Sequence, residues 1–176
     1  MTEAERKTAQ KRLLDGDAEA FGALYAELAV PLYRFALSTL GNETDAEDAV
    51  QEACLSAFKN RRSLKKAESF KSWLFAITAN RCRDVLRARA RVVPTDPEDG
   101  ALQGESYETP FGDGAALLCC LNDTDRQIVT LSVLGNYTGE EIGHILGMKA
   151  ATVRSRLSRA LKTCRKEWET EYGKGL

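Results

Sequence analysis

Apolar residues recur every three or four positions along most of this 176-residue chain. Between residues 18 and 40 they are Phe21, Leu24, Tyr25, Leu28, Leu32, Phe35 and Ala36. Side chains at that spacing share one face of an α-helix, whereas a half-buried strand requires strict alternation. No stretch alternates convincingly in that way. We therefore expect an all-α protein, in which Pro31 kinks or breaks this helix.

The same spacing predicts six further helices, in two groups. They cover residues 42–60, 69 to about 91, 115–121, 123–134, 138–146 and 150–168. Residues 92–113 are instead rich in proline, glycine and acids, which is typical of a flexible linker. The sequence thus indicates two small helical domains, residues 1–91 and 114–176, joined by a flexible acidic linker. Extended, that linker reaches about 70 Å, enough to hold the domains one to two DNA turns apart.

Charge is strongly segregated, although the formal net charge is only −1. Residues 59–91 hold eleven basic residues against two acids, and residues 149–166 hold seven basic residues and no acid. Between them, residues 94–123 hold seven acids and no lysine or arginine. Two separate basic elements favour a polyanionic partner such as nucleic acid. The alternative is a pair of ordinary solvated helix faces.

Membrane insertion and secretion are not expected. The longest uncharged stretch runs only from Gln127 to Gly139, well short of the ~18 apolar residues of a membrane span. The charged N-terminus lacks the apolar core of a signal peptide. The protein is therefore expected to remain in the cytoplasm.

The chemistry-bearing residues favour binding over catalysis. Five cysteines with no CxxC pair fit a reducing compartment and indicate buried structural thiols, with a redox-sensing thiol as the alternative. The sole histidine, His144, is expected to be an exposed helix residue. No phosphate loop, hydrolase motif or zinc spacing is present. We therefore expect no catalytic residue, metal or cofactor.

The C-terminal domain carries a helix-turn-helix pattern. Thr138 and Glu141 form a capping box at the start of a short helix that ends at Gly147, and a longer basic helix follows. The apolar stripe of the longer helix consists of Val153, Leu157, Ala160, Leu161, Cys164 and Trp168. The opposite face is small and polar, then cationic, which suits a DNA major groove. A helical hairpin with no role in DNA binding would tolerate the same pattern.

The helix that begins at Ser69 changes character along its length. Its first turns are apolar and are expected to enter the core through Phe70, Trp73, Leu74 and Ile77. Further along, a polar row covers about a third of the circumference: Asn80, Arg83, Asp84, Arg87 and Arg91. Such donors can bind bases or phosphates and stack on unpaired bases. The alternative is an ordinary surface on which Asp84 bridges to Arg87.

The helix over residues 42–60 has an acidic face that does not favour nucleic acid. Its members are Asp45, Glu47, Asp48, Gln51 and Glu52. A protein partner suits this face better.

Taken together, these segments resemble the bacterial sigma factors of the extracytoplasmic-function (ECF) type, which have only regions two and four. Residues 45–52, DAEDAVQE, are similar to the region-two segment that docks on RNA polymerase. Residues 69–87 are similar to the helix that melts the promoter and reads the minus-ten element. Residues 121–126, 140–142 and 152–160 are similar to region four, which reads the minus-thirty-five element.

The resemblance assigns residues to three surfaces. For core RNA polymerase it implies Asp45, Asp48, Gln51 and Glu52. For minus-ten DNA it implies Asn80, Arg83, Asp84 and Arg87. For minus-thirty-five DNA it implies Lys149, Thr152, Arg154, Ser155, Ser158 and Arg159.

The resemblance also implies a function without chemistry of its own. The chain is expected to bind core polymerase and promoter DNA, to start transcription of a stress-response regulon, and to be held by an anti-sigma factor. Two other classes stay open on the residues alone. One is an ordinary helix-turn-helix regulator, against which the helical N-terminal domain argues. The other is an enzyme with a cysteine nucleophile, although no base is placed with any cysteine.

Overall fold

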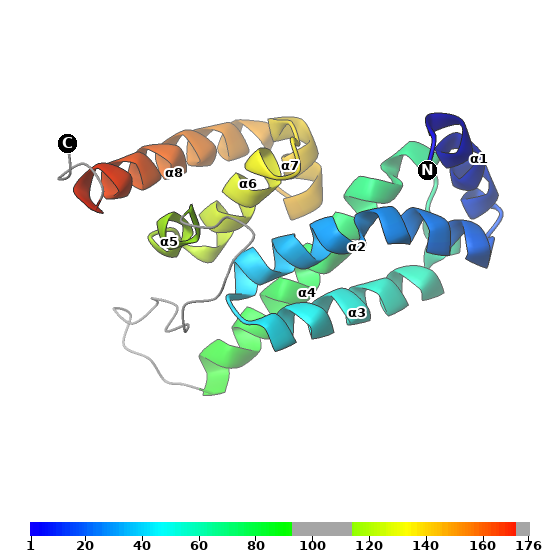
Figure 1. The fold of residues 1–176 in the computed structure, drawn as a ribbon, viewed down its shortest axis with the longest axis horizontal. Helices are drawn as coiled ribbons and strands as arrows, with labels where there is room; N and C mark the ends of the chain where they lie inside the picture. Colours follow the sequence, from blue (N-terminus) through cyan, green and yellow to red (C-terminus); the bar gives the residue numbers. More distant parts are fainter. Residues whose placement is uncertain (93–113, 172–176) are drawn as a thin grey trace.

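The computed structural model describes residues 1–92 and 114–171, and every regular element in these ranges is helical (Figure 1). The all-α prediction is confirmed. The predicted linker, residues 92–113, lies outside the described residues apart from its first position.

Four α-helices make up the N-terminal set. They are α1 (Glu3–Leu14), α2 (Ala18–Leu40), α3 (Glu43–Lys59) and α4 (Phe70–Val92), with 3₁₀ turns at Arg61–Ser63 and Ala67–Ser69 between the last two. The helix α2 continues through Pro31, so the predicted break does not occur. Asp17 and Asn42 accept backbone hydrogen bonds at the starts of α2 and α3, which satisfies amides that the helices leave unpaired.

The helix α1 was not predicted, because its apolar residues are too few to mark a face. Its start carries a capping box, in which Glu5 N donates to Thr2 Oγ1 and Thr2 N donates to the Glu5 carboxylate. Arg6 pairs with Glu27 of α2 at 3.0 Å, and Leu13 is fully buried. These contacts fasten α1 onto α2.

The C-terminal set consists of α5 (Gly114–Cys119), α6 (Asp123–Val133), α7 (Gly139–Leu146) and α8 (Ala150–Glu171). Val153 and Ala160 of α8 are buried, as predicted. Leu161 and Trp168 are exposed. The predicted apolar stripe of α8 is therefore buried only over its first half.

The two sets of helices pack against each other and share one apolar core, with α2 against α6 and α4 against α7 (Figure 1). The two predicted sets of helices are present, and the sequence did not indicate that they touch. The contact involves the end of α2, where residues 35–40 are all buried. A helix that packs on one side buries one face only, so a fully buried stretch requires neighbours all round.

The cysteines differ from their predicted environment. Only Cys82 is buried; Cys54 and Cys164 are half-buried, and Cys119 and Cys120 are exposed. The exposed pair lies at the end of α5, a short helix that packs on α8 and accepts a hydrogen bond from Arg126 of α6 at Leu118 O.

Candidate nucleic-acid interface

The helix-turn-helix is formed by α7 and α8. The predicted capping box is present, since Glu141 N donates to Thr138 Oγ1 and Thr138 N donates to the Glu141 carboxylate. These bonds hold the pKa of Glu141 below its usual value. The turn needs two glycines. Gly147 has φ +68°, and a Cβ on Gly143 would lie 2.7 Å from the carbonyl oxygen of Met148.

The outward face of α8 and the turn before it present all six residues predicted to bind minus-thirty-five DNA. Each is exposed, and none of their side chains forms an ion pair or a hydrogen bond with another described residue: Lys149, Thr152, Arg154, Ser155, Ser158 and Arg159. The other arginine of this segment, Arg156, pairs instead with Asp125 of α6 at 2.6 Å. Arg156 therefore positions α8, while Arg154 and Arg159 leave their donors available to a ligand.

The polar row of α4 lies on one side of that helix, downstream of its buried start. Asn80, Asp84 and Arg87 are exposed and Arg83 is half-buried. Arg83 donates to the side-chain oxygen of Asn80. Arg87 lies 3.6 Å from Asp84, which is the ion pair predicted for an ordinary solvated surface. These exposed contacts are weak, so a nucleic acid can replace them at small cost.

The four residues of α3 that the sequence assigns to core polymerase divide into two pairs. Asp45 forms an ion pair with Arg89 of α4, and Glu52 forms one with Arg81 of α4 at 2.8 Å. Asp48 and Gln51 are exposed and have no such partner among the described residues. The structure thus brings the first pair against α4 and leaves Asp48 and Gln51 outward.

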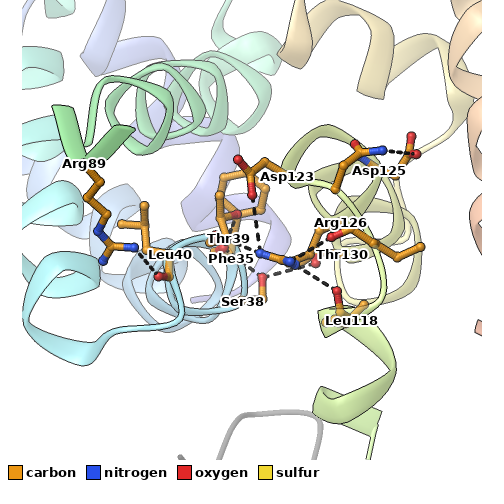
Figure 2. A network of polar contacts seen from close by, with 12 residues as sticks. Phe35, Ser38, Thr39, Leu40, Arg89, Leu118, Asp123, Asp125, Arg126 and Thr130 are labelled. Atoms are coloured by element: carbon orange, nitrogen blue, oxygen red, sulfur yellow. Dashed lines mark hydrogen bonds and ion pairs between the residues drawn. The ribbon is translucent and has the colours of Figure 1, made fainter. Parts of the chain in front are cut away.

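A buried arginine joins the N-terminal set of helices, α1–α4, to the C-terminal set, α5–α8 (Figure 2). These two sets are the two halves of the molecule. Arg126 of α6 is 2% exposed and donates to Leu118 O at 3.0 Å, to Leu121 O at 2.8 Å and to Thr39 O of α2 at 3.4 Å. Asp123 lies 3.6 Å away. Burial lowers the pKa of this guanidinium, and Asp123 opposes that shift. Three carbonyl acceptors and one carboxylate compensate for the buried charge.

A second buried contact lies beside it (Figure 2). Ser38 of α2 donates to Phe35 O at 2.9 Å, and its oxygen lies 3.1 Å from the hydroxyl of Thr130 of α6. Because Ser38 has only one hydroxyl hydrogen, Thr130 is the donor in this second bond. Both hydroxyls are thereby satisfied inside the core that the two halves share.

Tyr137, between α6 and α7, packs on α4. Its ring meets Phe75 edge-on, with centroids 5.4 Å apart, and Lys71 Nζ lies 4.5 Å from the ring centroid. Its hydroxyl is buried and has no hydrogen-bond partner among the described residues. Burial raises the pKa of this phenol.

No pattern in the sequence predicts that Arg126, Thr130 and Tyr137 join the two halves. The only local feature of Arg126 is that it directly precedes an uncharged run with apolar periodicity. No signal pointed to Tyr137, whose partners lie about sixty residues earlier in the chain. The contact between the halves depends on three-dimensional packing that no local pattern encodes.

Within residues 1–92 and 114–171, no three histidine, cysteine or acidic side chains gather in a way that could hold a metal ion. Across the same part of the chain, no helix combines the length and apolar character needed to cross a bilayer. His144 is exposed, as predicted.

Comparison with known families gives two matches, one in the N-terminal half of the chain and one in the C-terminal half. Residues 24–92 match sigma-70 region 2, and residues 115–164 match sigma-70 region 4. The chain is 33% identical over 149 residues to the ECF RNA polymerase sigma factor SigM of Mycobacterium tuberculosis, covering 82% of this chain and 75% of SigM. It is 26% identical over 174 residues to SigW of Bacillus subtilis, covering 89% and 93%.

Solved structures share the fold. CnrH, solved with the cytosolic domain of CnrY, superposes with a TM-score of 0.71 at 24% identity, covering 96% of this chain and 99% of that one. RpoE of Bartonella quintana, solved with the anti-sigma factor NepR, gives a TM-score of 0.68 at 26% identity, covering 85% and 98%.

Proposed function

The chain belongs to the ECF sigma factors of bacterial RNA polymerase, and we propose how its surfaces divide the work of that family. It binds core polymerase and directs promoter recognition, DNA melting and initiation. The family is a non-enzymatic initiation factor, so the residues of interest bind and position. A stress-response regulon and a site of action in the bacterial cytoplasm are parts of the proposal.

We assign the minus-thirty-five element to the outward face of α8, and this face is the observation that carries the proposal. Arg154 and Arg159 are exposed without an acidic partner in the described chain, whereas Arg156 is held by Asp125. Arginine donors aimed at solvent from a helix-turn-helix are suited to base edges and phosphates.

We assign the minus-ten element to the polar row of α4, and polymerase docking to the α3 face around Asp48 and Gln51. Asp45 and Glu52 belong to the same acidic face, and their ion pairs with Arg89 and Arg81 also hold α3 against α4. A polymerase surface bound on α3 is therefore connected rigidly to the helix that reads DNA.

The two halves must separate when the protein acts at a promoter. Elements near positions −10 and −35 are about 25 base pairs apart, which is roughly 85 Å of B-DNA. A compact chain of this length has a radius of gyration of only about 16 Å. The packed arrangement therefore represents the resting form, and we propose that polymerase binding opens it along the contact made by Arg126, Thr130 and Tyr137.

An anti-sigma factor is a further proposed partner. The related RpoE was solved with one, and the chain presents two basic faces and one acidic face with which such a protein would compete. Recovery of polymerase subunits alone from native cells, resting and stressed, would count against it.

Run-off transcription tests the function directly. Purified protein and core polymerase should give a defined transcript from the upstream region of the protein's own gene, and core polymerase alone should not. An ordinary helix-turn-helix regulator would bind DNA without co-eluting with core polymerase. Failure to co-elute and to initiate would overturn the assignment.

A further inference from the structure

Two thiols of the C-terminal half meet at one backbone carbonyl. Cys120 follows α5 and Cys164 lies on α8. Cys120 Sγ donates to Leu117 O at 2.9 Å, and Cys164 Sγ donates to the same oxygen at 3.4 Å. The two sulfur atoms are therefore neighbours at the junction of α5 and α8, although they lie far apart in the sequence.

The two thiols differ in their access to solvent. Cys120 is exposed and Cys164 is half-buried, whereas Cys82 in the N-terminal half is buried. Burial raises the pKa of Cys120, and the neighbouring Cys164 thiol opposes that shift. Burial and the nearby Cys120 raise the pKa of Cys164 to about 11. An oxidant from solvent therefore meets Cys120 first, with Cys164 placed behind it.

We propose that Cys120 and Cys164 are a site of thiol oxidation, at which a hydroperoxide converts the two thiols into an intramolecular disulfide. The Cys120 thiolate attacks the peroxide, forming an S–O bond as the O–O bond breaks, and water or an alcohol leaves. The Cys164 sulfur then attacks the sulfenic acid, forming the S–S bond as the S–O bond breaks, and water leaves. Two thiols lose two hydrogens, and one peroxide is reduced.

The bridge would close a loop that contains α6, α7 and α8 as far as Cys164. It would fasten the turn after α5 to the helix that carries Arg154 and Arg159. A cross-link of this kind restricts the unfolded and partly opened states. The oxidised C-terminal half should therefore exchange its α5 and α8 amide hydrogens more slowly than the reduced one.

Mass spectrometry of the full chain tests the proposal. Reduced protein is treated with hydrogen peroxide, its remaining thiols are alkylated, and the intact mass and tryptic peptides are measured. Wild type and the Cys119→Ser control should each lose two hydrogens. Each should give the peptide that contains Cys120 joined by a disulfide to the peptide that contains Cys164. Cys120→Ser and Cys164→Ser should not. Closure should become faster between about pH 7 and pH 9, because the raised pKa values keep both thiols protonated near neutrality.

Several results would overturn the proposal. They are equal bridging in Cys120→Ser through Cys119, arrest of Cys120 at the sulfinic acid without a bridge, and disulfides formed only between separate molecules. Far-UV circular dichroism of each variant shows whether it is folded. If a serine variant is not, Cys120→Ala and Cys164→Ala replace it.

Discussion

Replacing Tyr137 with alanine should release the two halves of the protein from each other. The tyrosine ring meets Phe75 edge-on at 5.4 Å and lies 4.5 Å from Lys71 Nζ, so both contacts cross from the C-terminal half to α4. Contacts of these two kinds contribute about 1–2.5 kcal/mol together. Their loss shifts the equilibrium between packed and open forms toward the open form by roughly 5- to 70-fold.

Energy transfer between two dyes measures that shift. The dyes are attached through genetically encoded azide side chains at Glu19 on α2 and Lys162 on α8, both exposed. The Tyr137→Ala protein should populate longer distances than wild type. Its apparent affinity for core polymerase should rise by up to the same factor, because a larger fraction is already open.

The matched control is Tyr137→Phe, which keeps the ring and removes a buried hydroxyl that has no partner among the described residues. It should retain the packed form and be at least as stable as wild type. Unchanged distances and unchanged polymerase affinity in Tyr137→Ala would refute the reasoning. Equal opening in Tyr137→Phe would show that the ring contacts do not hold the halves together.

Three further predictions concern the surfaces. Asp48→Arg should weaken binding to core polymerase in a co-elution assay. It should leave the melting temperature unchanged, since Asp48 is exposed and unpaired within the described chain. The control is the same change at Glu3, an exposed residue of α1. If Arg154 and Arg159 read bases, Arg154→Ala and Arg159→Ala should each cost about 1–3 kcal/mol of promoter affinity and relax specificity at one position. If they contact phosphates, each change should weaken binding to all DNA sequences alike. Promoter binding that matches wild type at every salt concentration would contradict both roles. Thr138→Ala should lower the free energy of unfolding by about 1 kcal/mol at neutral pH. This loss should shrink in acid, because the stabilisation from the lowered pKa of Glu141 disappears as the pH falls through that pKa. A loss of stability that does not change with pH would contradict the prediction.

The sequence predicted individual helices well, because each is encoded by its own periodicity and end signals. Thr138 and Gly147 mark the limits of α7 to the residue. It missed α1, whose start carries a capping box but whose surface is mostly charged, so that periodicity alone gave no face. Of the two effects predicted for Pro31, a kink or a break, the break does not occur, because the proline lies inside α2 at an exposed position.

The sequence predicts which residues of the candidate site face outward, but it does not predict which charged side chains form ion pairs. A helical projection places Arg154 and Arg159 outward, but it cannot tell that Arg156 is held by Asp125, which is 31 residues earlier. The same limit applies to α3, where Asp45 and Asp48 look equivalent on a wheel. Only the position of α4 distinguishes them, because Arg89 reaches the first and not the second. Such pairings depend on how helices cross.

The hydrogen bonds of Arg126 all go to main-chain oxygens, those of Thr39, Leu118 and Leu121. Every amino acid supplies such an oxygen, so position 39 can change its side chain without removing the acceptor. Paired substitutions across a family of sequences would therefore carry little trace of this contact, and methods that infer proximity from correlated change would overlook it. By the same reasoning, a chimera that takes its first half from a relative should still offer Arg126 its partner.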